Sequence, residues 1–124
     1  MIGRTGRFER ADRLLDSRDF QRISREGRRA ASAEFVMLIT PSACGDRSRV
    51  GISASRRVGN AVVRNRIKRR VRDWFRRERE SLPGNVDLVV IARSKASRLT
   101  EKGSVAMALD KTLARAKQQW KATP

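Results

Sequence analysis

The chain has 124 residues, the length of one compact domain, and carries 30 basic against 13 acidic residues, a net charge of +17. This excess predicts a polyanionic partner, and the absence of a membrane-length apolar run or a secretory signal favours nucleic acid in the cytoplasm over an anionic membrane. The sequence has no histidine and one cysteine, Cys44, which excludes histidine-based catalysis, a Cys/His zinc site and an internal disulfide.

The N-terminal part predicts a basic arm. Residues 1–16 hold four arginines and two glycines, which is typical of a mobile arm, although a frayed terminus that is basic by chance is the alternative. One RNA-binding domain is expected over residues 17–120, followed by a short tail over 121–124.

A first helix is predicted over residues 17–28, where Asp16 or Ser17 can serve as the N-cap and Gly27 can end the helix. Its apolar anchors are Leu15, Phe20 and Ile23. Phe20 is either an ordinary core residue or a platform on which a nucleic-acid base stacks.

Two strands are predicted next, over residues 33–40 and 49–55, with a turn between them that begins at Pro41. The second strand alternates: one side carries Val50, Ile52 and Ala54, and the other carries Arg49, Gly51, Ser53 and Ser55. We expect the two strands to pair as an antiparallel hairpin. The small, polar second face of this hairpin would leave room for an extended ligand strand.

Residues 62–79, VVRNRIKRRVRDWFRRER, predict an amphipathic helix with two unlike faces. At about 100° per residue an arc of roughly 120° holds the apolar side chains Val63, Ile67, Val71, Trp74 and Phe75, which predicts docking on a core. The rest of the surface is almost entirely basic, and a polyanion would relieve its self-repulsion. Asn60 is the predicted N-cap, and the helix start beside Arg56 and Arg57 suits a phosphate or another anion.

Pro83 and Gly84 end this helix near Leu82. The next segment, Val86–Ala92, is apolar almost throughout, so we expect a strand with both faces covered. A basic loop over residues 93–98 leads to a last helix, which begins near Thr100 and extends to about Gln119. Its inner stripe is Val105, Leu109, Leu113 and Ala116. This order predicts a single α+β domain in which helices pack on a mixed sheet.

The segment GNAVVRNRIKRRVRDWF, residues 59–75, resembles the signature of the bacterial ribonuclease P protein component, including its RNR motif at Arg64, Asn65 and Arg66. Residues 13–29, 49–57 and 86–96 resemble the flanking segments of that family in the same order. The resemblance implies an α/β sandwich of helix–strand–strand–strand–helix–strand–helix order around a central basic helix, with a left-handed crossover. A similar domain occurs in ribosomal proteins.

The resemblance also implies a function, that of the protein subunit of a ribonucleoprotein endoribonuclease that removes the 5′ leader from precursor transfer RNA. In this family the RNA subunit holds the catalytic Mg²⁺ ions and hydrolyses the phosphodiester. The protein binds the RNA subunit and the leader. No metal bound by the protein alone, no second protein and no membrane are expected.

Two surfaces carry over from the family. The surface expected to bind RNA comprises Arg56, Arg57, Asn60, Arg64, Asn65, Arg66, Lys68, Arg69, Arg70 and Arg72. For each arginine the alternative is a solvated face, which is the expectation for Arg76, Arg77 and Arg79. The cleft expected to hold the leader comprises Phe20, Phe35, Val36, Leu38, Ser53 and Ser55.

Phe20 matches an aromatic of the family's cleft, whereas Phe35 matches a commonly aromatic position for which core packing is the alternative. Ser24 and Leu38 stand where many members have aromatics, and the chain has no tyrosine. Weaker stacking on leader bases is therefore expected, with backbone charge carrying more of the binding.

Two other functions fit parts of the sequence. A general RNA-binding or ribosomal protein would explain the charge but not the motif block. A self-sufficient nuclease would need paired acids for two metals, and the aspartates near the basic surfaces show no such spacing. They are Asp12, Asp16, Asp19, Asp73 and Asp87.

Overall fold

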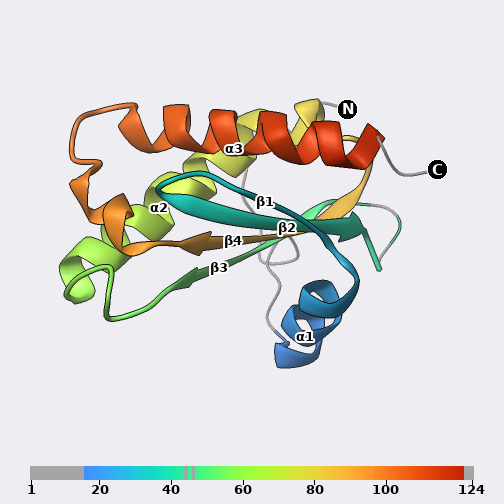
Figure 1. Ribbon diagram of the computed structural model, residues 1–124, viewed down its shortest axis with the longest axis horizontal. Helices are drawn as coiled ribbons and strands as arrows, with labels where there is room; N and C mark the ends of the chain where they lie inside the picture. The colour runs from blue at the N-terminus through green and yellow to red at the C-terminus, as the bar shows by residue number, and fades with distance from the viewer. Residues whose placement is uncertain (1–15, 44, 46, 122–124) are drawn as a thin grey trace.

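The computed structural model describes residues 16–43, 45 and 47–121, so the expectations for residues 1–15, Cys44 and 122–124 lie outside it. Its elements follow the predicted helix–strand–strand–strand–helix–strand–helix order, which confirms the α+β fold (Figure 1). In chain order they are α1 (Ser17–Glu26), β1 (Arg28–Ala31), β2 (Phe35–Pro41), β3 (Arg49–Ala54), α2 (Ala61–Glu78), β4 (Val86–Ala92) and α3 (Ser104–Lys121). Short 3-10 turns follow α2 at Arg79–Ser81 and β4 at Ser94–Arg98.

The four strands form one mixed sheet in the order β1-β2-β4-β3. β4 pairs antiparallel with β2 and parallel with β3. The predicted antiparallel hairpin of residues 33–40 with 49–55 is therefore wrong, because β4 lies between the two strands. Since β4 is apolar almost throughout, the central position lets it pair along both edges and bury both faces.

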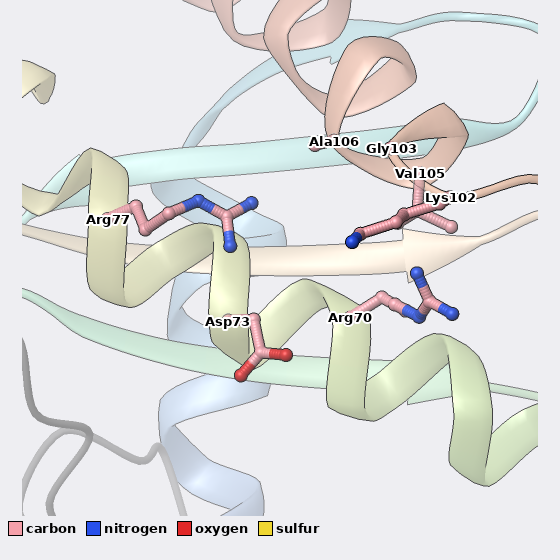
Figure 2. A pocket seen from close by; sticks show the side chains of 7 residues that line it. All are labelled: Arg70, Asp73, Arg77, Lys102, Gly103, Val105 and Ala106. Atoms are coloured by element: carbon pink, nitrogen blue, oxygen red, sulfur yellow. The ribbon is translucent and has the colours of Figure 1, made fainter.

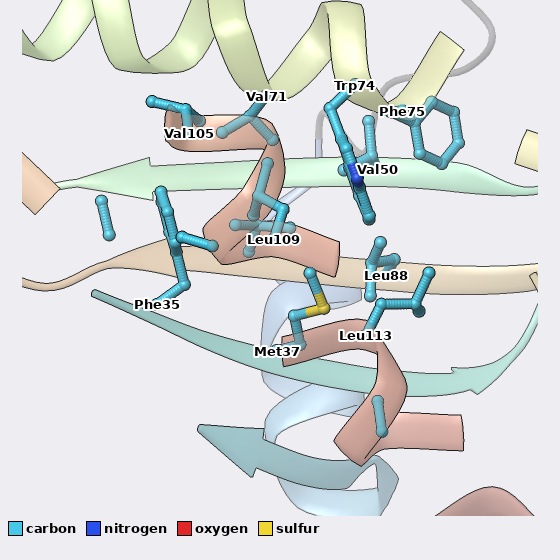
Figure 3. Packing of buried hydrophobic residues seen from close by; sticks show 14 of the residues in the cluster. Phe35, Met37, Val50, Val71, Trp74, Phe75, Leu88, Val105, Leu109 and Leu113 are labelled. Carbon is cyan, nitrogen blue, oxygen red and sulfur yellow. The ribbon is translucent and has the colours of Figure 1, made fainter. Parts of the chain in front are cut away.

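The helices cover the two faces of the sheet unequally: α2 and α3 lie together on one face, and α1 lies alone on the other (Figure 1). α3 contacts β1 and β2, whereas α2 contacts β3. The main core fills the space between the sheet and the helix pair, with Phe35 and Leu88 from strands facing Trp74 and Leu109 from helices (Figure 3). Within the described ranges no helix is long and apolar enough to cross a membrane.

The first helix begins as predicted, because the Asp16 side chain accepts a hydrogen bond of 2.9 Å from the Arg18 N–H. It ends at Glu26 rather than Arg28, and the chain turns directly into β1. A Cβ atom on Gly27 would lie 2.6 Å from the Ile23 carbonyl oxygen, so only glycine fits this close approach. Residues 28–31, RRAA, have no apolar alternation, which is why their strand was not assigned from the sequence.

The basic helix α2 forms as predicted. The Asn60 side chain caps it by accepting from the Val63 N–H at 3.0 Å. Four residues of the apolar stripe are buried, and Val63 packs at its margin; the four are Ile67, Val71, Trp74 and Phe75. The indole N–H of Trp74 donates to Asp110 at 2.8 Å and thereby joins α2 to α3. The buried stripe fixes which way the arginines of α2 point.

Candidate nucleic-acid interface

The basic side chains of α2 form separate rows because residues four positions apart lie on the same side of a helix. Arg64 and Arg66 differ by about 200° around the axis and therefore belong to opposite flanks. One flank carries Arg64, Lys68 and Arg72, called here the outer row. The other flank carries Arg66, Arg70 and Arg77, called here the inner row, and the crest between them carries Asn65, Arg69 and Arg76.

The inner row faces α3. Arg70 and Arg77 line a surface pocket together with residues from the start of α3 (Figure 2). Because α2 packs over β3 and α3 packs over β1 and β2, the outer row lies on the opposite flank, toward the β3 edge of the sheet. The predicted RNA-binding residues of α2 therefore lie on one helix surface but point in three directions.

The cations of this surface have few partners within the protein. Arg56, Arg57, Asn65 and Arg69 are exposed, and the other predicted members from Arg64 to Arg72 are half-buried. No described acidic residue lies within ion-pair distance of Arg64, Arg66, Lys68, Arg69 or Arg70. The Nε of Arg64 and one terminal nitrogen of Arg66 are covered by neighbouring atoms yet donate to no described group. Such donors are poorly satisfied until an acceptor reaches them.

The approach to α2 also brings the predicted residues together. The turn after β3 carries Arg56 and Arg57, and the Arg57 N–H donates to the Ser55 hydroxyl at 3.3 Å. A Cβ atom on Gly59 would lie 3.0 Å from the Val63 side chain, so the turn runs close against the first turn of α2. Asn60 follows and is exposed. These residues lie at the helix start, where the N–H groups favour an anion.

The predicted leader cleft corresponds to the sheet face on which α1 lies. Ile23 of α1 packs against Leu38 and Val89, with Phe20 and Ile91 at the margin of this small cluster. By strand alternation Val36 and Ser53 share that face with Leu38. Val36 and Leu38 are each 8% exposed, and Ser53 on the edge strand β3 is exposed. Ser55 lies just beyond the end of β3 and is also exposed.

Phe35 does not belong to this cleft. Its side chain is 0% exposed and packs in the main core (Figure 3). Leu38 belongs to the separate cluster under α1, on the other face of the sheet. The placement of Phe35 in the cleft is therefore corrected, because adjacent residues of a strand point to opposite faces. Of the two cleft aromatics expected from the sequence, Phe20 alone remains.

A buried ion-pair cluster, which sequence reasoning missed, holds α1 against the sheet. Asp87 of β4 is fully buried and accepts from the Arg49 guanidinium at 2.9 and 2.8 Å, from the Ala43 N–H at 3.1 Å, and from Arg22. Asp19 lies 3.4 Å from Arg49. The sequence signal for this cluster was Asp87 itself, a single acidic residue in an otherwise apolar strand.

The surroundings of Asp87 set its protonation. Burial alone would raise the pKa of its carboxyl, but the hydrogen bonds from Arg49, the Ala43 N–H and Arg22 outweigh it, so the pKa lies below the usual 3.8. Asp87 is thus ionised, and both of its carboxylate oxygens accept hydrogen bonds. In the described part of the chain, no group of three or more acids, histidines or cysteines is arranged to hold a metal ion.

Comparison with known proteins decides among the RNA-binding alternatives. The ribonuclease P family model matches residues 8–117. The chain belongs to the ribonuclease P protein family. Ribonuclease P protein components are 43% identical over 95 residues in Desulforapulum autotrophicum, covering 77% of this chain and 80% of the relative, and 39% identical over 110 residues in Shouchella clausii, covering 89% of each.

Solved ribonuclease P proteins share the fold. The Staphylococcus aureus protein superposes with a TM-score of 0.79 at 35% identity, over 89% of this chain and 99% of that one. The Thermotoga maritima protein gives a TM-score of 0.72 at 39% identity, over 83% and 96%. The resemblance seen in residues 59–75 is thereby confirmed, together with the role in tRNA processing that it implies.

Proposed function

We propose that this protein is the protein subunit of a bacterial ribonuclease P, and that it binds the catalytic RNA through α2 and the 5′ leader of precursor tRNA in the α1 cleft. The observation that carries the proposal is the charge of α2. On this helix of a ribonuclease P family fold, five cations between Arg64 and Arg70 have no described acidic partner. The proposal places the protein in the cytoplasm with its RNA partners.

The helix suits an RNA backbone for physical reasons. Its buried stripe fixes the direction in which each row points, so the helix itself need not reorient on binding. Guanidinium groups donate in a planar fork that matches phosphate oxygens. Each phosphate that they neutralise releases condensed counterions, which makes the affinity strong at low salt and steeply salt-dependent.

On this proposal the leader lies as an extended strand along the sheet face beside α1. α1 covers the sheet near Leu38 and Val89, and Phe20 stands at the margin of that contact. The exposed Ser53 adds a hydroxyl group to this otherwise apolar face at the β3 edge, toward which the outer row of α2 points. A leader on this face would stack one base on Phe20 and run toward the β3 edge of the sheet.

The chemistry is assigned to the RNA subunit. The acids of the described chain do not suit a catalytic magnesium site, because Asp87 is engaged by Arg22 and Arg49 and no acidic group is assembled elsewhere. We therefore assign the catalytic Mg²⁺ ions to RNA phosphates and no catalytic residue to the protein. Its cations reduce the repulsion between two RNAs, and less free Mg²⁺ is then needed to bring them together.

Reconstitution tests the proposal. The purified chain is added to a bacterial ribonuclease P RNA at a low Mg²⁺ concentration, and release of the leader from precursor tRNA is followed. We expect the chain to restore cleavage that the RNA alone performs poorly under these conditions. Failure to restore cleavage, or cleavage by protein scrupulously freed of RNA, would contradict the proposal. Recovery of ribosomal RNA as the dominant bound RNA from cells would support the general RNA-binding alternative instead.

A further inference from the structure

A pocket of about 550 Å³ lies between the second half of α2 and the start of α3 (Figure 2). It lies on the side of the sheet that α2 and α3 cover, opposite the side that carries α1 (Figure 1). Only Arg70 among its residues belongs to the RNA-binding set predicted from the sequence. The lining residues are Arg70, Asp73, Arg77, Lys102, Gly103, Val105 and Ala106.

Three cations converge on this pocket. Figure 2 shows the side chains of Arg77, on α2, and Lys102, in the turn before α3, reaching toward each other, with the guanidinium of Arg70 beneath Lys102. The carboxylate of Asp73 points away from Lys102, and neither Asp73 nor any other described acid forms an ion pair with these cations. Three like charges around one space repel, so an anion placed among them is favoured.

The backbone at the start of α3 adds a smaller positive charge to the pocket. α3 begins after Gly103, which has no side chain to cap it, and the Ser104 hydroxyl donates to the Glu101 carbonyl at 2.7 Å instead of accepting from the helix. The first N–H groups of α3 therefore add partial positive charge beside Lys102.

We infer that this pocket binds a backbone phosphodiester of the catalytic RNA, held by Arg70, Arg77 and Lys102. Two guanidinium groups and one ammonium group suit a phosphate, whose oxygens accept from both. Arg70 follows Arg66 on the inner row, so the pocket continues the α2 surface onto α3. The sheet and its core separate the pocket from the α1 cleft, so the RNA that reaches it is the subunit bound by α2 and not the leader. The inference rests on the proposed function.

Substitution of the α3 side isolates the pocket from the rest of α2. Lys102→Gln removes one pocket charge at an exposed position, and Lys111→Gln is the matched control, since Lys111 is also an exposed lysine of this region and does not line the pocket. Affinity for the catalytic RNA is measured against salt concentration for both variants. We expect the logarithmic slope to become shallower by about 0.7–0.9 for Lys102→Gln and by about twice that for Lys102→Gln with Arg77→Gln. The control should keep the wild-type slope.

Equal slopes for Lys102→Gln and Lys111→Gln would overturn the inference, provided that circular dichroism shows both folded. Two further arms separate the sources of phosphate. A loss confined to precursor tRNA binding by the assembled holoenzyme would contradict the assignment to the catalytic RNA. Stabilisation of the wild type by inorganic phosphate, without any change of the RNA slope in Lys102→Gln, would make the pocket a site for free anions only.

The cleavage reconstitution and the salt titration together distinguish the two proposals. If the wild-type chain does not restore precursor cleavage, the proposed function fails. If the wild type restores cleavage and binds the RNA with a steep slope, but the pocket variants match Lys111→Gln, only the pocket assignment fails.

Discussion

The arginines of the α1 side and two arginines of α2 have different roles, because the former pair with acidic residues of the protein and the latter pair with none that the structure describes. On the α1 side, Arg22 and Arg49 both pair with the buried Asp87, and Arg49 also approaches Asp19. On α2, Arg64 and Arg66 have no described acidic partner although parts of both side chains are covered. The paired arginines hold α1 on the sheet. The charges of Arg64 and Arg66 are not neutralised by a described acid and are available to a partner outside the chain.

The comparison predicts its largest effect at Asp87. Asp87→Asn keeps the side-chain shape but leaves Arg22 and Arg49 without their shared carboxylate, and we expect it to lower the free energy of unfolding by about 3 kcal/mol. Urea unfolding measures the change. Asp73→Asn is the control, because Asp73 pairs with no described cation, and a shift within about 0.5 kcal/mol is expected. Equal effects of the two variants would contradict a structural role for the cluster.

The same cluster predicts an acid-sensitive fold. Because the pKa of Asp87 is lower in the folded than in the unfolded chain, the unfolded chain binds its proton more tightly, and stability rises with pH in this range. The contribution is complete above the usual pKa of 3.8 and is lost as the pH falls through the lower folded value. Urea midpoints of wild type and Asp87→Asn should therefore converge below about pH 4. A gap that stays constant from pH 7 to pH 3 would count against ionisation of Asp87.

The cleft predicts a smaller and more selective effect. Phe20→Leu keeps an apolar contact with the cluster of Ile23 and Leu38 but removes the ring, so binding of leader-bearing precursor should weaken by about 1–2 kcal/mol. Holoenzyme affinity for precursor tRNA and for mature tRNA, compared side by side, tests this. An equal loss for mature tRNA would show that Phe20 acts through folding and not through the leader.

The sequence predicted correctly those features that depend on neighbouring residues along the chain. The 3.6-residue period of α2 identified its apolar stripe and its basic surface together, and Asn60 marked its start. The apolar run of β4 correctly indicated a strand covered on both faces. The motif block in residues 59–75 led to the family, which no period or charge count could have named.

The errors arose where distant segments decide the outcome. Neighbouring strands were expected to pair, but β4, more than thirty residues further on, inserts between β2 and β3. Phe35 was expected in the cleft because it matches a commonly aromatic position of the family. Since β2 is buried on both faces, its apolar pattern does not distinguish the face toward α1 from the face toward the main core. Asp87 finds Arg49 and Arg22 at sequence separations of 38 and 65 residues, a distance at which no local pattern exists.

Two charge-matched variants test most directly whether the unpaired arginines bind RNA and the paired ones hold the fold. Affinity for the catalytic RNA is measured against salt for Arg66→Ala and Arg22→Ala, together with urea unfolding of each. For Arg66→Ala we expect the slope of log affinity against log salt concentration to become shallower by about one, with little change in stability. For Arg22→Ala we expect an unchanged slope and a lower free energy of unfolding. Equal slopes for the two variants, or a shallower slope for Arg22→Ala alone, would contradict the division.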